Sequence, residues 1–359
     1  MGLLRPFQNA IGIDISDGVV RMVQLQKKGK GFALRSVSAR PVPAGHILEG
    51  EIRNHEGVIS VLKDLLAQPT FKHPSSRAAI VCLPERKIFT KIIELPNVPP
   101  EQFTAALHDG LAQNIPLNLD EAYLDWQYVQ PPEAKAKTVR VVVAVAPQLL
   151  VEGYSSVLEN IGIIPLVFEP ESAALSRVAL DPSAPTGSHL IIDLGATRTG
   201  VIITENDVVA YSSTLPLSGN HLTSMLQMKL GLSTEEAEEA KRICGLDPRK
   251  GKGAVRSILE PELKPLIQKI MEVVSFYEEH VTEAMRVQDI TLVGGGARLI
   301  GLAPFIQSTL HLPVRIGDWP KSITPPPAPL DLVGPSYLTA VGLAMRGVQN
   351  LPWFPPRNL

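Results

Sequence analysis

The chain has 359 residues, a formal net charge of −2, 45% hydrophobic residues and 19% charged residues. This length favours two lobes over a single core, and the composition is that of a globular protein. The near-neutral charge argues against a nucleic-acid-binding surface. Cys82 and Cys244 are far apart in the sequence and fit a reducing compartment, and no histidine spacing indicates a zinc site.

No apolar stretch is long enough to cross a bilayer, and the longest, Val141 to Pro147, is typical of a buried strand. The N-terminal residues Met1 to Pro6 lack the long apolar core of a signal peptide. We therefore expect a cytoplasmic protein that reaches a membrane only by binding a partner.

The first 84 residues predict a lobe of strands with one helix. Apolar and alternating patterns predict strands at 10–15, 19–27, 31–41 and 78–83, and apolar residues at helical spacing predict a helix at 55–67. We assign residues 1–84, 166–185 and a C-terminal helix at 336–349 to this first lobe.

Residues 85–165 predict a separate module. Its elements follow the order β-α-β-β-α, and a final strand leads back to the first lobe. The expected ranges are 87–95, 100–114, 123–129, 138–146 and 148–160, with the last strand at 166–169. This order describes a small α/β sandwich inserted into the first lobe.

A linker rich in Pro, Ser and Gly at 182–187 precedes the second lobe, which we assign to 186–219 and 286–335. A third strand is expected at 207–214, later strands at 290–293 and 314–316, and a helix at 301–309. Residues 220–285 predict a helical subdomain, with helices at 220–230, at 234–244 with a Ser233–Glu236 capping box, and from Glu260 to Met285 with a kink at Pro265. The proline-rich residues 350–359 predict a flexible tail.

One hairpin motif occurs twice. In each copy an apolar strand carries an aspartate near its end, a tight turn of small residues follows, and a second apolar strand begins. The copies run from Ile11 to Val20 around Asp14 and from Leu190 to Val201 around Asp193. Two such hairpins indicate two halves that face each other across a cleft. A carboxylate and backbone N–H groups at each tip suit a metal-bound nucleotide.

These hairpins and the segments 169–175, 218–223, 238–241 and 294–296 resemble, in their order, the signatures of the actin, Hsp70 and FtsA superfamily of two-lobed nucleotide-binding proteins. More closely, the chain resembles the PilM-type family of type IV pilus assembly proteins. The resemblance implies an α/β, actin-like (ribonuclease H-like) two-lobed fold with an FtsA-like inserted α/β subdomain.

The resemblance also implies ATP and Mg²⁺ as cofactors. Asp14 and Asp193 would hold magnesium through water, and Glu171 and Asp193 would be the catalytic residues, with Glu171 near the attacking water. Glu238 and Lys241 would contact the ribose and adenine. The other residues implied in nucleotide binding are Ser16, Asp17, Gly18, Val19, Gly195, Ala196, Thr197, Gly219, Gly294, Gly295 and Gly296.

The first hairpin departs from the family pattern. Ser16 and Asp17 stand where relatives have glycine and then Ser or Thr. An acidic side chain there would repel phosphates unless it points away or helps to hold the cation. A plain hairpin turn at Asp17-Gly18 is the alternative interpretation. We therefore expect ATP binding and at most slow hydrolysis, and we expect Arg198 to be solvated.

The resemblance implies a cytoplasmic ATP-binding scaffold for type IV pilus (type II secretion-like) assembly. In PilM-type proteins, a groove between the inserted subdomain and the first lobe receives the N-terminal peptide of the inner-membrane protein PilN. Such a partner would recruit the chain to the inner face of the cytoplasmic membrane.

Other interpretations stay open. The alternatives are an FtsA-like division or filament protein, a small-molecule kinase of the same superfold, and a scaffold that binds no nucleotide. The tail segment Asn350-Leu351-Pro352-Trp353 is similar in character to the PilN peptide. One hypothesis is therefore self-association, in which the tail fills the groove of its own or a neighbouring chain; a disordered tail is the alternative.

Overall fold

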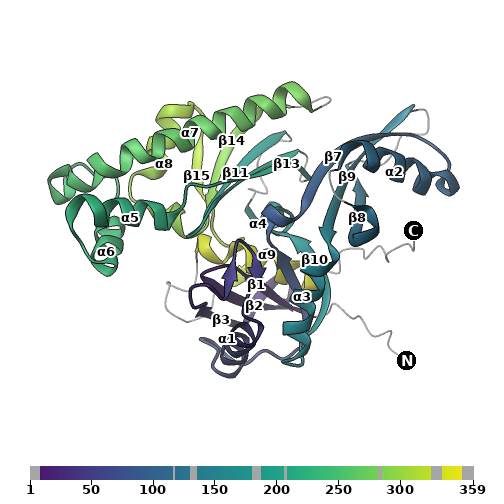
Figure 1. Ribbon diagram of the computed structural model, residues 1–359, viewed down its shortest axis with the longest axis horizontal. Coiled ribbons are helices and arrows are strands. Elements are labelled where there is room, and N and C mark those ends of the chain that lie inside the picture. The colour runs from purple at the N-terminus through teal and green to yellow at the C-terminus, as the bar shows by residue number, and fades with distance from the viewer. Residues whose placement is uncertain are drawn as a thin grey trace.

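A computed structural model describes residues 9–115, 118–129, 136–179, 187–205, 208–281, 285–324 and 334–349. Two large sheets, each with helices against it, form two lobes, and a smaller three-stranded module stands beside them (Figure 1). The predicted linker at 182–187, the proline-rich residues 325–333 and the predicted tail at 350–359 lie largely or wholly outside the described residues.

The first lobe is built on a six-stranded sheet in the order β10-β6-β1-β2-β3-β16. Its strands are β1 (Ile11–Ile15), β2 (Val19–Lys28), β3 (Gly31–Pro41), β6 (Ala78–Leu83), β10 (Ile164–Pro170) and β16 (Ile323–Thr324). The helices α1 (His55–Ala67) and α3 (Gln148–Glu159) share a core with β1 and β6, and the short pair β4 (Ile47–Leu48) and β5 (Glu51–Ile52) lies nearby.

The second lobe is built on a five-stranded sheet in the order β13-β12-β11-β14-β15. Its strands are β11 (Ser188–Leu194), β12 (Thr199–Glu205), β13 (Val208–Leu215), β14 (Val287–Val293) and β15 (Val314–Ile316). Its helices are α5 (Gly219–Leu230), α6 (Thr234–Cys244), α7 (Ala254–His280) and α8 (Leu302–Leu310). The Ser233–Glu236 capping box predicted for α6 is present.

The predicted start of the long helix at Glu260 is wrong. α7 begins at Ala254, and both Pro261 and Pro265 lie inside it. Val255 and Leu259 continue the buried apolar stripe of the helix towards its N-terminus. Packing against the second sheet therefore outweighs the main-chain hydrogen bonds that the two prolines remove.

The inserted module has its own sheet and core. Its elements are β7 (Phe89–Pro96), α2 (Pro100–Asn114), β8 (Ala122–Tyr128) and β9 (Thr138–Pro147). β9, with its β-branched run, is the central strand of the order β7-β9-β8. Leu107 and Leu111 of α2 pack on Val141 and Val143 of β9. β7 and β8 are therefore both edge strands of a module that stands to one side of the two lobes (Figure 1).

Two helices, α4 (Glu171–Ala179) and α9 (Leu338–Gln349), join the lobes through one shared core. This core contains Val23 of the first sheet, Ile191 of the second sheet and Val341 of α9. α9 approaches β1 so closely that a Cβ added at Gly12 would lie 2.3 Å from the carbonyl oxygen of Ala340. The C-terminal helix α9 therefore packs against β1 of the first lobe and contributes to the core between the lobes.

Candidate nucleotide site between the two hairpins

The first hairpin joins β1 to β2 and places Asp14 near its tip. Ser16 donates from both its amide and its hydroxyl to the carbonyl oxygen of Val19, at 3.1 and 2.8 Å, and so closes the turn. The Asp14 carboxylate is 5% exposed and lies 3.5 Å from the guanidinium of Arg21 on β2. Burial raises the pKa of Asp14 to about 6 against the opposing effect of Arg21.

Asp17, the acidic residue in this turn, is held away from the second hairpin. Its carboxylate accepts hydrogen bonds from the amides of Glu49 and Gly50, at 3.2 and 2.9 Å. The Tyr154 hydroxyl donates to the carbonyl oxygen of Gly50 at 2.9 Å. Asp17 therefore fixes the turn between β4 and β5, and its charge is already balanced by two N–H groups.

The second hairpin joins β11 to β12 and places Asp193 opposite Gly200. The amide of Gly195 donates to the carbonyl oxygen of Arg198 at 2.9 Å. Burial, the charge of Glu171 and a hydrogen bond to Glu171 raise the pKa of Asp193 to about 8. The structure therefore brings carboxylates from both hairpins and from α4 close together.

Arg198 was expected to be solvated, and that expectation is wrong. Its guanidinium donates to the carboxylate of Glu171, and the two side chains are only 13% and 12% exposed. Arg198 also opposes the raised pKa values of Asp14 and Asp193. A cation is required here because three carboxylates share a space with little water. We call Asp14, Glu171, Asp193 and Arg198 the carboxylate cluster.

The start of α5 is bonded to the second hairpin. The amides of Gly219 and Asn220 donate to the carbonyl oxygens of Gly195 and Ala196, both at 2.9 Å. Ser218 caps the helix by accepting from the amide of His221 at 3.2 Å. The predicted connecting segment and the second hairpin thus form one rigid unit.

The Glu238–Lys241 pair on α6 faces the same place. The Lys241 ammonium donates to the carbonyl oxygen of Gly219 at 2.9 Å and lies 2.7 Å from the Glu238 carboxylate. Thr223 donates to Glu238 at 2.6 Å. Lys241 is only 13% exposed, so this pair is more than a solvated pair on a helix surface.

The glycine turn after β14 packs against the second hairpin. Gly294 has φ +80°, and a Cβ there would lie 2.2 Å from Asp193 Oδ1. A Cβ at Gly296 would lie 2.8 Å from the Cβ of Leu194, whereas no atom would lie within 4 Å of a Cβ at Gly295. Glycine at positions 294 and 296 therefore allows the turn to pack closely against the second hairpin. The open space at Gly295 would leave room for a nucleoside.

These contacts show which predicted residues meet. The residues that meet at the second hairpin are the carboxylate cluster, Gly195, Ala196, Gly219, Lys241 and the glycine turn. Ser16 and Asp17 bond elsewhere, and Gly18 has open space around it. Thr197 lines an adjoining cleft, described below, which Arg198 also lines. Arg21 was not among the predicted site residues, and Arg198 was expected in solvent; the available signal was a basic residue within seven positions after each hairpin aspartate.

The carboxylate cluster fits a hydrated magnesium ion. Among the described ranges, no group of three or more His, Cys, Asp or Glu side chains has the geometry of a direct metal cage. Magnesium usually keeps several waters and binds proteins through one or two carboxylates plus substrate phosphates. Asp14 and Asp193, on opposite hairpins, supply such a pair. The cluster therefore matches a water-mediated site better than a closed one.

A family model described as type IV pilus assembly protein PilM matches residues 12–348. The chain belongs to the PilM family. Among solved structures it is similar to the PilM–PilN type IV pilus biogenesis complex, with 25% sequence identity and a TM-score of 0.80 over 95% of this chain and 98% of that one.

More distant structures share the fold of this PilM-family chain. EutJ from Carboxydothermus hydrogenoformans is 16% identical with a TM-score of 0.56, over 94% of this chain and 89% of that one. MreB5 of Spiroplasma citri bound to ADP is 12% identical with a TM-score of 0.55, over 95% of this chain and 96% of that one. The predicted actin-like, two-lobed α/β fold is confirmed.

Curated relatives match over a shorter range. Cell division protein FtsA of Pseudomonas aeruginosa is 28% identical in an alignment over 185 residues that covers 45% of this chain and 42% of FtsA. Ethanolamine utilization protein EutJ of Escherichia coli is 26% identical in an alignment over 164 residues that covers 44% of this chain and 51% of EutJ. The chain spans about half the length of the curated relatives it matches.

Among the described residues, none of the helices combines the length and apolar character of a membrane span.

Proposed function

We propose that this PilM-family chain is a cytoplasmic scaffold of type IV pilus assembly that binds magnesium-ATP between its lobes. The observation that carries this proposal is the carboxylate cluster, in which Asp14 and Asp193 come from two different lobes. A ligand held by both carboxylates favours one arrangement of the lobes. Nucleotide binding would thus alter the surface that partners contact.

The nucleotide would bind along the unit formed by the second hairpin. Asp14 and Asp193 would hold magnesium through water, and the ion would neutralise phosphate charge. The turn residues 195–197 and the open side of Gly295 would accept phosphates and nucleoside, with Glu238 and Lys241 beside the ribose. In the first hairpin, Gly18 and Val19 would contribute main-chain groups, whereas Ser16 and Asp17 would act as structural residues.

Calorimetric titration with magnesium-ATP tests this proposal. We expect a Kd below about 1 mM for the wild type, an affinity in the range of ordinary metabolite binding. Asp193→Ala should lose most of this affinity. The matched control is His108→Ala, which truncates an exposed residue of α2 in the inserted module and should bind normally. Absence of wild-type binding at millimolar nucleotide would refute the proposal.

Hydrolysis is a separate question from binding. Glu171 is engaged by Arg198, so a water activated by this carboxylate would require that ion pair to rearrange. We therefore propose a slow ATPase at most. Phosphate release should be abolished in Glu171→Gln while magnesium-ATP affinity is retained. Release at equal rates from both proteins would assign hydrolysis to a contaminant or to another residue.

The proposed partner is the cytoplasmic N-terminal peptide of a PilN-like inner-membrane protein, as in the PilM–PilN complex. Large apolar side chains are exposed where the module meets the first lobe, with Tyr123 of β8 51% and Leu149 of α3 84% exposed. Asp125 of β8 lies close enough to Arg346 of α9 for their charges to interact. This border offers both an open strand edge and apolar contacts for a peptide.

Binding of a synthetic PilN N-terminal peptide tests this partner. Tyr123→Ala should weaken binding about tenfold, because exposed tyrosines are frequent hot spots. The matched control is Met228→Ala, which truncates an apolar residue of α5 that is at least as exposed. If both variants bound the peptide equally well, the peptide would not bind at β8. Such a partner would recruit the chain to the inner face of the cytoplasmic membrane.

The FtsA-like alternative has less support, because the PilM model matches residues 12–348 whereas FtsA matches less than half of the chain. Nothing in the described residues favours a small-molecule kinase. The PilN peptide assay also separates these alternatives, since neither a kinase nor a division protein should bind that peptide. The self-association hypothesis concerns residues 350–359, which lie outside the described residues.

A further inference from the structure

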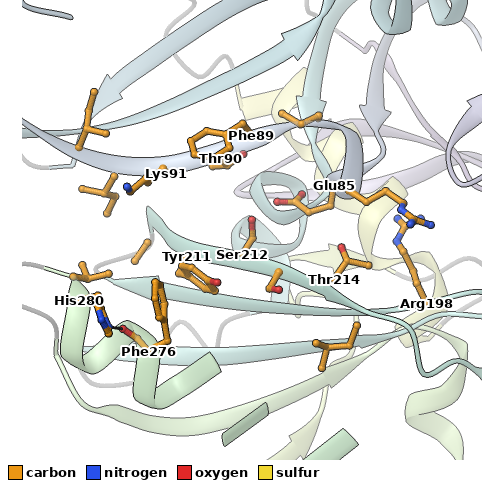
Figure 2. Close-up of a pocket in the computed structure, with 18 of the residues that line it drawn as sticks. Glu85, Phe89, Thr90, Lys91, Arg198, Tyr211, Ser212, Thr214, Phe276 and His280 are labelled. Carbon is orange, nitrogen blue, oxygen red and sulfur yellow. Dashed lines mark hydrogen bonds between the residues drawn. The ribbon is translucent and has the colours of Figure 1, made fainter. Parts of the chain in front are cut away.

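A large cleft separates the inserted module from the second lobe (Figure 2). Its volume is about 1340 Å³. Consecutive residues line its walls, 88–94 in and just before β7 and 210–216 in and just after β13, and Glu85 also lines it. Small-molecule pockets usually measure about 300–1,000 Å³. The size and the elongated walls suit a segment of polypeptide better than a small ligand.

Both walls of the cleft are edges of sheets, which touch each other along part of their length and are separated elsewhere by the cleft. β7 is the outer strand of the module sheet, and β13 is the outer strand of the second-lobe sheet. Natural edge strands are usually protected by charged residues or proline. β7 carries Lys91, Glu94 and Pro96, whereas β13 reads Val-Val-Ala-Tyr-Ser-Ser-Thr-Leu and has neither charge nor proline. β13 is therefore the edge that is suited to accept another strand.

The cleft also contains buried acceptors without partners. Glu85, in the short helical turn η1 (Glu85–Lys87), is 7% exposed. Its Oε2 accepts from the amide of Ser172 at 3.0 Å, and the Ser212 hydroxyl lies near the carboxylate, but Oε1 makes no hydrogen bond of normal geometry among the described residues. Thr90 Oγ1 on β7 is likewise buried and has no hydrogen-bond partner among the described residues. Leaving such a group unpaired costs about 1–3 kcal/mol, which a donor from a bound ligand would recover.

Burial raises the pKa of Glu85, so the donor that fits best is one that brings a positive charge to this carboxyl group. The three arginines that line the cleft are already paired: Arg86 with Glu49 at 3.1 Å, Arg140 with Glu205 at 2.9 Å, and Arg198 with Glu171. Glu171 adds a second negative charge near Glu85. A lysine or arginine side chain from the ligand would complement this buried carboxylate. Tyr211 and Phe276, with ring centroids 5.6 Å apart, offer an apolar surface for the stem of that side chain (Figure 2).

We propose that an extended segment of a partner protein enters this cleft, pairs as an added strand with β13, and places a lysine or arginine side chain against Glu85. The site lies at the opposite edge of the module from β8. The cleft adjoins the nucleotide site, because Thr197 and Arg198 of the second hairpin also line it, but strand pairing with β13 requires neither the nucleotide nor the PilN-like peptide. With both edges occupied, the module would hold two extended peptides, one towards each lobe.

A displayed library of random peptides tests the proposal on the full chain. The peptides should have about eight residues, the length of β7 and of β13. We expect selected sequences to alternate β-branched or aliphatic residues around one fixed Lys or Arg. A selected peptide should bind Glu85→Gln about tenfold more weakly, since tenfold corresponds to the ~1.4 kcal/mol of one charge-assisted contact. Glu101→Gln, an exposed glutamate of α2 outside the cleft, should bind as the wild type does.

Two further measurements keep the proposal testable if Glu85→Gln folds poorly. Ser213→Lys adds a charge to the β13 edge and should abolish peptide binding. N-methylation of alternate peptide amides should remove binding in one register only, because only every second amide of an added strand faces β13. The proposal is overturned if no peptide is enriched, if binding survives Ser213→Lys, or if Tyr123→Ala rather than Glu85→Gln removes it.

Discussion

The two hairpins share one backbone plan but connect to different surroundings. Each carries one charged residue in its turn, Asp17 in the first and Arg198 in the second. Asp17 bonds to the amides of Glu49 and Gly50 and so fixes a neighbouring turn of its own lobe. Arg198 instead pairs with Glu171, beside Asp193. The first turn is thus bonded to main-chain amides of its own lobe, whereas the second is bonded to Glu171, a residue proposed for catalysis.

The largest expected effect comes from removing the anchor of the second hairpin. Arg198→Met leaves Glu171 and its neighbouring carboxylates without their cation. Breaking a buried pair on one side destabilises a protein by about 3–5 kcal/mol. We expect the free energy of unfolding in urea to fall by about 3 kcal/mol.

The double variant Arg198→Met/Glu171→Gln is the control for this prediction. It removes both charges of the pair and should recover much of the lost stability. If the single variant were as stable as the wild type, Arg198 would be a surface residue in solution and the contrast between the hairpins would disappear.

Asp193→Asn should have the next largest effect, on binding. The amide keeps the size of the side chain but cannot serve as an anionic partner of hydrated magnesium. Loss of such an outer-shell partner typically costs about 10–100-fold in metal affinity. Titration with ATP in the presence and absence of magnesium measures this directly. An equal loss in both conditions would contradict a magnesium role and indicate direct contact with the nucleotide.

The same carboxylate predicts a pH dependence of stability. The pKa of Asp193 is raised from 3.8 to about 8, so between these values the folded state holds a proton that the unfolded state has released. Its contribution to the free energy of unfolding therefore falls as pH rises from about 4 to about 8. We expect Asp193→Asn to become more stable relative to the wild type over this window, measured by urea unfolding without nucleotide or magnesium. A constant difference across the window would show that the pKa of Asp193 is not raised.

The local parts of this site could be predicted from the sequence. Strand alternation and an aspartate before a small-residue turn define each hairpin, and the capping box at Ser233 is likewise a short-range pattern. The long-range contacts could not be predicted. Arg198 meets a carboxylate 27 positions away, and Asp17 meets amides 32 and 33 positions away. The early start of α7 has the same origin, because the burial of Val255 depends on a sheet assembled from other segments.

The smallest expected effect tests the first hairpin. Asp17→Asn keeps an acceptor oxygen for the amide of Gly50 but loses the charge that strengthens both hydrogen bonds. We expect the free energy of unfolding to fall by about 1 kcal/mol, a typical value for one such bond. Magnesium-ATP affinity should change less than about threefold, because the Asp17 carboxylate is already bonded to main-chain amides of its own lobe and need not face the phosphates. A tenfold loss of affinity would make Asp17 a ligand of the cation, and the two hairpins would then be functionally equivalent.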